Sequence, residues 1–345
     1  MKIMGAASAS GVALLVLMIT GSRAERSSFP CTTVDECTAA ALWHIPGPNP
    51  IVSPWNPDGK AAWMSTECEV AGGVQKVNET YVFVYHCLGT AGYRVGMSTA
   101  PTPMGPWTKP PVKPNLDVTK GAWDKDVVAS FNILPDPEKP GQWLGYFEGG
   151  MPPSGKEDWS MGVARAPSPL GPWTKDPKNP ILDGNRTCDP GREFVGKCGG
   201  LYVASVMHGP HTNGEYWVYM EAPINENDEG PLALWTSKKP DGPFTFKAYI
   251  LDGGKHPGEW DYGRYSESRV WYYNGLFHLF ATGSPVGGKH ENKLNEQIGW
   301  AVSTNGVNFT EYMLRQHTSI SEAQHHPFDC SIRIVSLHHT IMCIE

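Results

Sequence analysis

The sequence predicts an all-β protein, a five-bladed β-propeller, on three observations. A unit of fixed length recurs along the chain, which is typical of propellers and other repeat architectures. Aromatic and β-branched residues, which favour strands, recur in each unit. The 345 residues also include 38 Gly and 31 Pro, and this density predicts many turns between short strands.

The repeat is clearest at its turn. Residues 98–109 read STAPTPMGPWTK and residues 164–175 read ARAPSPLGPWTK, while 236–246 (TSKKPDGPFTF) and 303–310 (STNGVNFT) are weaker copies. The turn glycine falls at positions 105, 171, 242 and 306, at intervals of 66, 71 and 64 residues. A period of this length indicates one repeated supersecondary unit per copy.

Each unit has the same order of elements. An inner strand and a turn come first, followed by an apolar strand, a polar loop, a third strand, the Gly-containing turn and an aromatic edge strand. Four strands per unit is the composition of a propeller blade. The expected second strands are 79–85, 143–147, 215–219 and 275–280, and the expected third strands are 93–98, 159–164, 231–236 and 298–303.

The length favours five blades. Removing a 24-residue leader from 345 leaves 321 residues, which a period of about 67 divides into five units. The last unit is short, since 331–345 supplies only two strands; residues 49–53 can complete it by closing the ring, or the C-terminal end is incomplete or altered. A β-sandwich, the second architecture considered, does not explain the long period.

The N-terminus predicts secretion. Lys2 precedes an apolar run at 11–20, and Ser22-Arg23-Ala24 fits a small-x-small cleavage site, so we expect 1–24 to be a signal peptide. The run is shorter than the ~20 residues that span a bilayer. We therefore expect 25–345 to be one soluble, extracellular domain without a membrane partner. The net charge of −7 argues against a nucleic-acid partner.

All eight cysteines follow the expected cleavage site, which favours disulfides. Near-neighbour pairing is the expectation, although the sequence leaves the connectivity open. The absence of CxxC spacing argues against a zinc site built from cysteines. The expected pairs are Cys31–Cys37, Cys68–Cys87, Cys188–Cys198 and Cys330–Cys343. The sequons at Asn78, Asn185 and Asn308 are expected glycosylation sites on the surface.

The repeated Gly-Pro-Trp turns, the segment 123–134 (WDKDVVASFNIL) and the run 267–280 (ESRVWYYNGLFHLF) carry a resemblance. The chain resembles the five-bladed propeller glycoside hydrolases of family 43 and its clan, which includes arabinanases, xylosidases and fructan hydrolases. The resemblance covers nearly the whole mature chain, through short and degenerate motifs.

This resemblance implies carboxylates on the first strands of several blades, converging at the propeller axis. Glycoside hydrolysis requires one carboxyl group as acid and a second that activates water or attacks the sugar. By resemblance, Glu267 is the acid, and Asp126 or Glu67 is the base or a modulator. The family has Asp-Pro where this chain has Glu67, so Glu69 and Asp58 stay open as alternatives. Asp124 is an alternative to Asp126.

Other residues near the expected inner strands are candidates for substrate binding. Sugars stack on aromatic rings, which favours Trp123 and Trp260. Arg264 can bind hydroxyl or anionic groups of a substrate, or it can pair with Glu267 as a surface ion pair. The third blade opens without an acid, and Tyr202 or His208 is expected to face the axis there. At the period of the repeat, Glu67, Asp126, Tyr202 and Glu267 are expected to occupy equivalent positions at the blade openings.

The sequence therefore predicts a carbohydrate substrate and no cofactor. By resemblance, an axial calcium ion stays open. Two other functions also stay open, a propeller that binds glycans without cleaving them and an extracellular interaction scaffold.

Overall fold

The computed structural model describes residues 62–64, 67–89, 92–103, 105–108, 111–150, 159–183, 202–221, 232–251, 264–284 and 297–313. These residues form fifteen strands in four antiparallel sheets, with 3-10 turns at η1 (Ala62–Met64) and η3 (Pro210–Thr212) and no α-helix. The described part of the chain holds no helix that is long and apolar enough to cross a membrane.

Each sheet corresponds to one sequence repeat. The first contains β1 (Glu67–Val77), β2 (Thr80–Gly89) and β3 (Gly92–Ala100). The second contains β4 (Val127–Pro135), β5 (Trp143–Gly150), β6 (Ser160–Ala166) and β7 (Thr174–Lys175). The third contains β8 (Tyr202–His208), β9 (Tyr216–Glu221), β10 (Leu232–Ser237) and β11 (Thr245–Leu251). The fourth contains β12 (Arg264–Tyr273), β13 (Leu276–Ser284), β14 (Gln297–Ser303) and β15 (Thr310–Met313).

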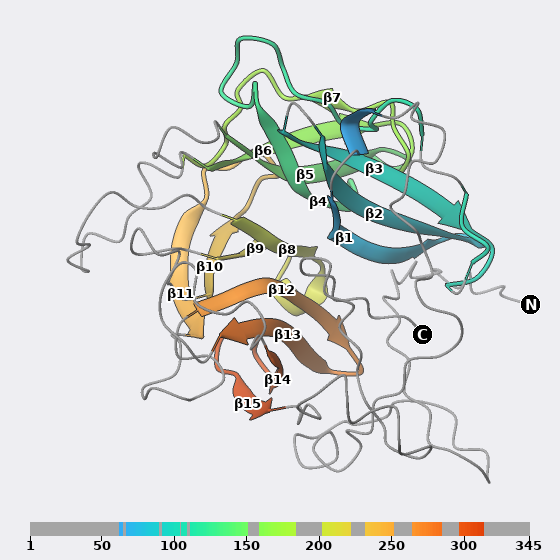
Figure 1. Cartoon of the computed structure of the whole chain (residues 1–345). Helices are drawn as coiled ribbons and strands as arrows, with labels where there is room; N and C mark the ends of the chain where they lie inside the picture. The colour runs from blue at the N-terminus through green and yellow to red at the C-terminus, as the bar shows by residue number, and fades with distance from the viewer. Residues whose placement is uncertain are drawn as a thin grey trace, which may run out of the picture.

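The first strand of each sheet lies innermost. Strand β1 contacts β4, β4 contacts β8, and β8 contacts β12. The sheets fan outward from these four strands, each toward its last strand (Figure 1). Four repeats are therefore arranged as neighbouring blades. The segments expected to form a fifth blade, 331–345 and 49–53, lie outside the described residues.

The hydrophobic core lies between neighbouring blades, because both faces of each sheet are covered. Phe131 and Phe147 of the second sheet pack with Val84 and Met97 of the first. Equivalent clusters join the second sheet to the third and the third to the fourth. This packing explains why the strands are apolar on both faces instead of alternating apolar and polar residues.

The Gly-containing turns fix the aromatic residue that follows them. Gly105 and Gly171 have φ angles of 95° and 99°, which side chains rarely adopt. Trp173 then packs edge-on against Phe131, with ring centroids 4.8 Å apart, and Trp107 lies 5.6 Å from Phe83. These repeated tryptophans are packing residues of the blades.

The second, third and fourth sheets each contain four strands, as predicted. In the first sheet the repeat places the fourth strand at Thr108 and the residue after it. Thr108 N–H donates to the Thr99 carbonyl at 2.8 Å, and 109–110 lie outside the described residues. Isolated bridges join Val95 to Leu116 in the first blade and Met161 to Leu182 in the second, where β7 has only two residues.

Two further sequence expectations concern the first blade. Cys68 and Cys87, which are opposite each other on β1 and β2, form a disulfide. Asn78 lies in the two-residue hairpin turn between these strands, is exposed and has a φ angle of 55°. The other three expected disulfides fall outside the described residues.

Candidate functional site

A β-bulge interrupts each innermost strand. The register shifts between Val70 and Gly73 in β1, between Ala129 and Asn132 in β4, between Val203 and Ser205 in β8, and between Ser266 and Arg269 in β12. A bulge leaves residues outside the regular ladder and re-aims a side chain. The first residues of the four bulges are Ala71, Ser130, Ala204 and Glu267.

This register corrects one expectation. The sequence repeat suggested that Glu67, Asp126, Tyr202 and Glu267 occupy equivalent positions. Glu67 is instead the first residue of β1 and Asp126 directly precedes β4, whereas Glu267 lies inside β12 at its bulge. Among the aligned bulge positions of the four described innermost strands, Glu267 is the one acid.

Several candidates nevertheless gather at one end of the strands. Glu67, Tyr202 and Arg264 are the first residues of β1, β8 and β12, and they pair with Leu88, Glu221 and Ser284. Because the four blades repeat one strand order, their innermost strands begin at the same end of the ring. This end and the adjacent bulges form the candidate site. Trp260 and Asn185 lie outside the described residues.

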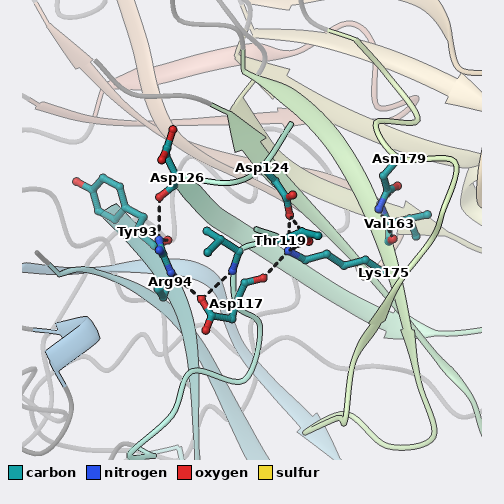
Figure 2. Close-up of polar contacts among 10 residues, drawn as sticks. Tyr93, Arg94, Asp117, Thr119, Asp124, Asp126, Val163, Lys175 and Asn179 are labelled. Atoms are coloured by element: carbon teal, nitrogen blue, oxygen red, sulfur yellow. Dashed lines mark hydrogen bonds and ion pairs between the residues drawn. The ribbon is translucent and has the colours of Figure 1, made fainter. Parts of the chain in front are cut away.

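The segment before β4 places Asp126 at this end. The Asp126 carboxylate pairs with Lys125 at 2.6 Å, and the Asp126 carbonyl accepts a hydrogen bond from the buried Arg94 at 2.8 Å. Arg94 also pairs with Asp117 at 2.7 Å. One guanidinium group of the first blade therefore binds the segment before β4 at two residues, Asp117 and Asp126 (Figure 2). Gly92 has no side chain to block the close approach of the Asp126 carbonyl.

Asp124 is occupied by a structural contact. Its carboxylate is buried and pairs with Lys175 on β7, and it accepts a hydrogen bond from the Thr119 hydroxyl at 3.3 Å (Figure 2). Burial lowers the pKa of Lys175, and the hydrogen bond with Asp124 opposes that shift. This pair holds the segment before β4 against the outer edge of the same blade, which leaves Asp126 as the more accessible acid.

The structure separates His208 from this end and gives Trp123 a packing contact. His208 is the last residue of β8, at the other end of the strand from Tyr202, about 20 Å away at the usual rise per strand residue. Its Nε2 lies 3.1 Å from the Gly214 carbonyl, and its ring packs on Tyr216. Trp123 is half-buried and stacks on Phe147 with ring centroids 5.7 Å apart. His208 therefore lies away from the candidate site, whereas a substrate contact by Trp123 stays a prediction.

Sequence reasoning missed a second set of polar residues. His86, Glu148 and Glu221 each follow an aromatic run of five residues in a second strand, in β2, β5 and β9. His86 Nδ1 accepts the N–H of Ser130, and Glu221 Oε1 accepts the N–H of Ser268, both at 3.1 Å. His86 and Glu221 therefore each bind a bulge of the next blade. The signal was present in the repeat, as a polar residue after YVFVY, WLGYF and YWVYM.

Metal binding has no support in the described part of the chain, where no three His, Cys, Asp or Glu side chains gather in an arrangement that can hold an ion.

His211 lies close to His208 and is partly buried. Burial lowers the pKa of His211, His208 lowers it further, and the His211 ring stacks on Tyr272 with centroids 4.5 Å apart. These two histidines are engaged in packing, away from the candidate site.

Neither a protein-family model nor a curated protein matches the sequence. Solved structures are similar to it in fold. They include Zg3597, a family 117 glycoside hydrolase from the marine bacterium Zobellia galactanivorans, at 16% identity and a TM-score of 0.51 over 76% of this chain and 74% of that one. A thermostable family-43 glycoside hydrolase matches at 14% identity and a TM-score of 0.50 over 72% and 73% of the two chains.

A third similar structure is BT0996, solved as an RGII complex, at 17% identity and a TM-score of 0.54 over 73% of this protein and 76% of that one. At these identities the similarity concerns the fold alone. The resemblance indicated by the sequence is confirmed at that level: this chain has the fold of glycoside hydrolases of the family 43 kind.

Proposed function

We propose that this protein is a secreted glycoside hydrolase. Its site is the end of the ring at which β1, β4, β8 and β12 begin. One observation carries the proposal: four innermost strands in consecutive contact each carry a bulge, and the bulge of β12 contains Glu267. We further propose that 331–345 and 49–53 complete a fifth blade, as in the family that the sequence resembles.

In this proposal Glu267 protonates the glycosidic oxygen of the leaving sugar. Asp126 or Glu67 is the second carboxylate, which activates water, attacks the sugar or tunes the acid. The bulge suits Glu267 for this role because a residue outside the ladder can project from the inner edge of its sheet. The hydrogen bond from Ser268 N–H to Glu221 fixes the backbone next to it.

Tyr202 and Arg264 are proposed substrate-binding residues, because they begin two of the innermost strands. Arg264 offers several N–H donors to sugar hydroxyls or to an anionic group, and a tyrosine ring offers a stacking surface with a polar end. The substrate class is an oligosaccharide or polysaccharide, and no part of the proposal requires nucleic acid or a membrane.

The experiment is a screen of the mature protein on plant, algal and animal glycans, with released reducing ends as the readout. Glu267→Gln should lower the rate on the best substrate by about 100-fold or more, because general acid catalysis contributes that much. Glu138→Gln, an exposed residue of the β4–β5 turn, is the matched control and should keep wild-type activity. Equal rates for wild type and Glu267→Gln would refute the proposal.

A second candidate function is glycan binding without hydrolysis. The observation that favours it is the absence of acids at three of the four aligned bulges, where Ala71, Ser130 and Ala204 stand. The same screen separates the two functions. Retention of the protein on an immobilised glycan, with no reducing ends released, supports a lectin.

Secretion and glycosylation are parts of the proposal with their own test. Asn78 and Asn308 are both exposed, in the β1–β2 turn and the β14–β15 turn. Expression through the secretory pathway should yield a mature chain that begins at Glu25, with glycans on these asparagines. Intact-mass measurement before and after enzymatic removal of N-glycans checks both points, and an unmodified chain starting at Met1 would contradict them.

A further inference from the structure

Ser130 is an exception within its strand. The other residues of β4 from Val127 to Ile133 are buried, as expected for a strand covered on both faces, but Ser130 is partly exposed. Neighbouring Ala129 is 2% exposed and Phe131 is completely buried. Because β4 is an innermost strand, the side that is left open to solvent is the side facing the axis.

The backbone of Ser130 is also unusual. Its φ angle is 44°, and the other non-glycine residues with positive φ in the described chain are Asn78, Asn213 and Asn274, all in turns. Asparagine tolerates this conformation, whereas other residues rarely adopt it. A serine in this conformation within a strand is therefore strained, and such strain persists only where the surroundings enforce it.

Two side chains hold Ser130 in this conformation. The Ser130 N–H donates to His86 Nδ1 of the first blade at 3.1 Å, and the Ser130 carbonyl accepts a hydrogen bond from Asn132 Nδ2 at 3.0 Å. His86 is buried, and its ring packs edge-on against Tyr93 with centroids 5.0 Å apart. Since Nδ1 accepts, the neutral ring carries its proton on Nε2. Side chains thus take the place of ladder partners at this bulge.

The hydroxyl remains available. Within the described residues, the Ser130 Oγ has no hydrogen-bond partner, and Ser130 occupies in β4 the bulge position that Glu267 occupies in β12. The bulges of the first two blades lie close together, since a Cβ on Gly72 of β1 would come within 2.1 Å of the Phe131 carbonyl oxygen.

We propose that Ser130 contacts a sugar hydroxyl at the axis, and that His86 is a positioning residue that holds the Ser130 bulge in its strained form. This inference rests on the proposed function and adds a ligand-binding residue from the second blade to the carboxylate of the fourth. The serine hydroxyl can both donate and accept a hydrogen bond, which suits a neutral sugar.

The test uses the full mature protein with Ser130→Cys and a small methanethiosulfonate reagent. Ser98→Cys is the matched control, because Ser98 is a serine of β3 that is 1% exposed. Position 130 should react much faster than position 98, and xylobiose, galactobiose or cellobiose, offered singly at millimolar concentration, should slow the reaction. A Ser130→Cys variant that reacts no faster than Ser98→Cys, or that none of these sugars protects, would overturn the inference.

Two further variants separate the hydroxyl from the strain and do not depend on the cysteine variant folding. Ser130→Ala keeps the strain and loses the hydroxyl, while Ser130→Gly loses both. Both should weaken binding of the protecting disaccharide by about tenfold, the usual effect of one hydrogen bond. Ser130→Gly alone should raise the melting temperature, because glycine adopts positive φ freely. Unchanged sugar affinity in both variants would overturn the inference.

The proposed function is tested separately by hydrolysis and its loss in Glu267→Gln. Either result can therefore fail while the other stands. Cleavage that depends on Glu267 without protection at position 130 would leave the hydrolase proposal intact and remove Ser130 from the site.

Discussion

Polar side chains near the centre of the ring are bound to the backbone of the next blade. His86 binds Ser130 N–H, Glu221 binds Ser268 N–H, and the Ser205 hydroxyl accepts the N–H of Val270 at 2.8 Å. An unpaired buried N–H costs free energy, and the contacts of His86 and Glu221 satisfy N–H groups that a bulge removes from the ladder. At the scale of single residues, these side chains fix the inner edge of the blades.

Glu221 should therefore affect the proposed chemistry through position and not through contact with substrate. Glu221→Gln keeps an oxygen acceptor for Ser268 N–H and should retain most of the activity, whereas Glu221→Ala removes the acceptor and should lower kcat by about tenfold or more through misplacement of Glu267. Steady-state kinetics and pH profiles of both variants check this. Equal losses in both variants, with an unchanged pH profile, would contradict a positioning role.

The burial of His278 makes the free energy of unfolding depend on pH. It is 3% exposed between Trp271 and Trp300, and burial lowers its pKa to about 4, against a small opposing effect of a hydrogen bond with the Tyr273 backbone. The unfolded chain binds a proton near pH 6.5 and the folded chain does not, so stability is full above pH 6.5 and falls as the pH drops toward 4.

Between pH 7 and pH 5, this group should cost the wild type about 2 kcal/mol of unfolding free energy. His278→Phe keeps an aromatic ring in the stack and should lose that part of the pH dependence. Urea denaturation of both proteins at the two pH values measures the difference. Parallel losses in wild type and variant would show that His278 does not cause the effect.

Sequence patterns predicted the place of Glu267 on an innermost strand but not its surroundings. The Asn-Gly turn and the aromatic run that follow it place Glu267 on an innermost strand, and the structure has it there. Nothing in the sequence of β4 marks Ser130, since its role depends on a register shift and on a histidine from another blade. His208 was expected to face the axis where the third blade opens, but it is the last residue of β8, whereas Asp126 directly precedes β4.

At the scale of elements, the innermost strands approach one another too closely for side chains at some positions. A Cβ on Gly72 would lie 2.1 Å from the Phe131 carbonyl oxygen. This oxygen belongs to the backbone of the next blade, so relieving the clash would require a backbone shift. By contrast, Gly141 in the β4–β5 turn has a φ angle of 84° and open space around it.

Gly72→Ala should therefore destabilise the protein by about 3 kcal/mol, since it forces two innermost strands apart. Gly141→Ala should cost only about 1 kcal/mol, the penalty of its backbone conformation without a clash. Chemical denaturation of both variants makes the comparison. A Gly72→Ala variant as stable as Gly141→Ala would show that β1 and β4 are not in this close contact.

The strands themselves were predictable, and the bulges were not. Aromatic and β-branched runs predicted all four second strands, and the structure extends them to β2, β5, β9 and β13. Bulges depend on how two blades fit together, a long-range property that local composition does not carry.

At the scale of the molecule, the repeat predicted the arrangement of the blades. Four repeats form four sheets whose first strands lie in consecutive contact, as a period of 64 to 71 residues requires. The prediction of five blades rests on the length of the chain, and the segments expected to form the last blade lie outside the described residues. In the proposed function the chemistry depends on several blades together, because the candidate residues come from different innermost strands and the segment before β4.

The most direct test of this account is a crystal structure of the mature Glu267→Gln variant with an oligosaccharide from the glycan screen. We predict that the sugar lies at the end of the ring where β1, β4, β8 and β12 begin. Its glycosidic oxygen should be about 3 Å from the side chain at position 267. A bound sugar with every atom more than about 12 Å from that side chain is too distant for direct proton transfer and would contradict the account.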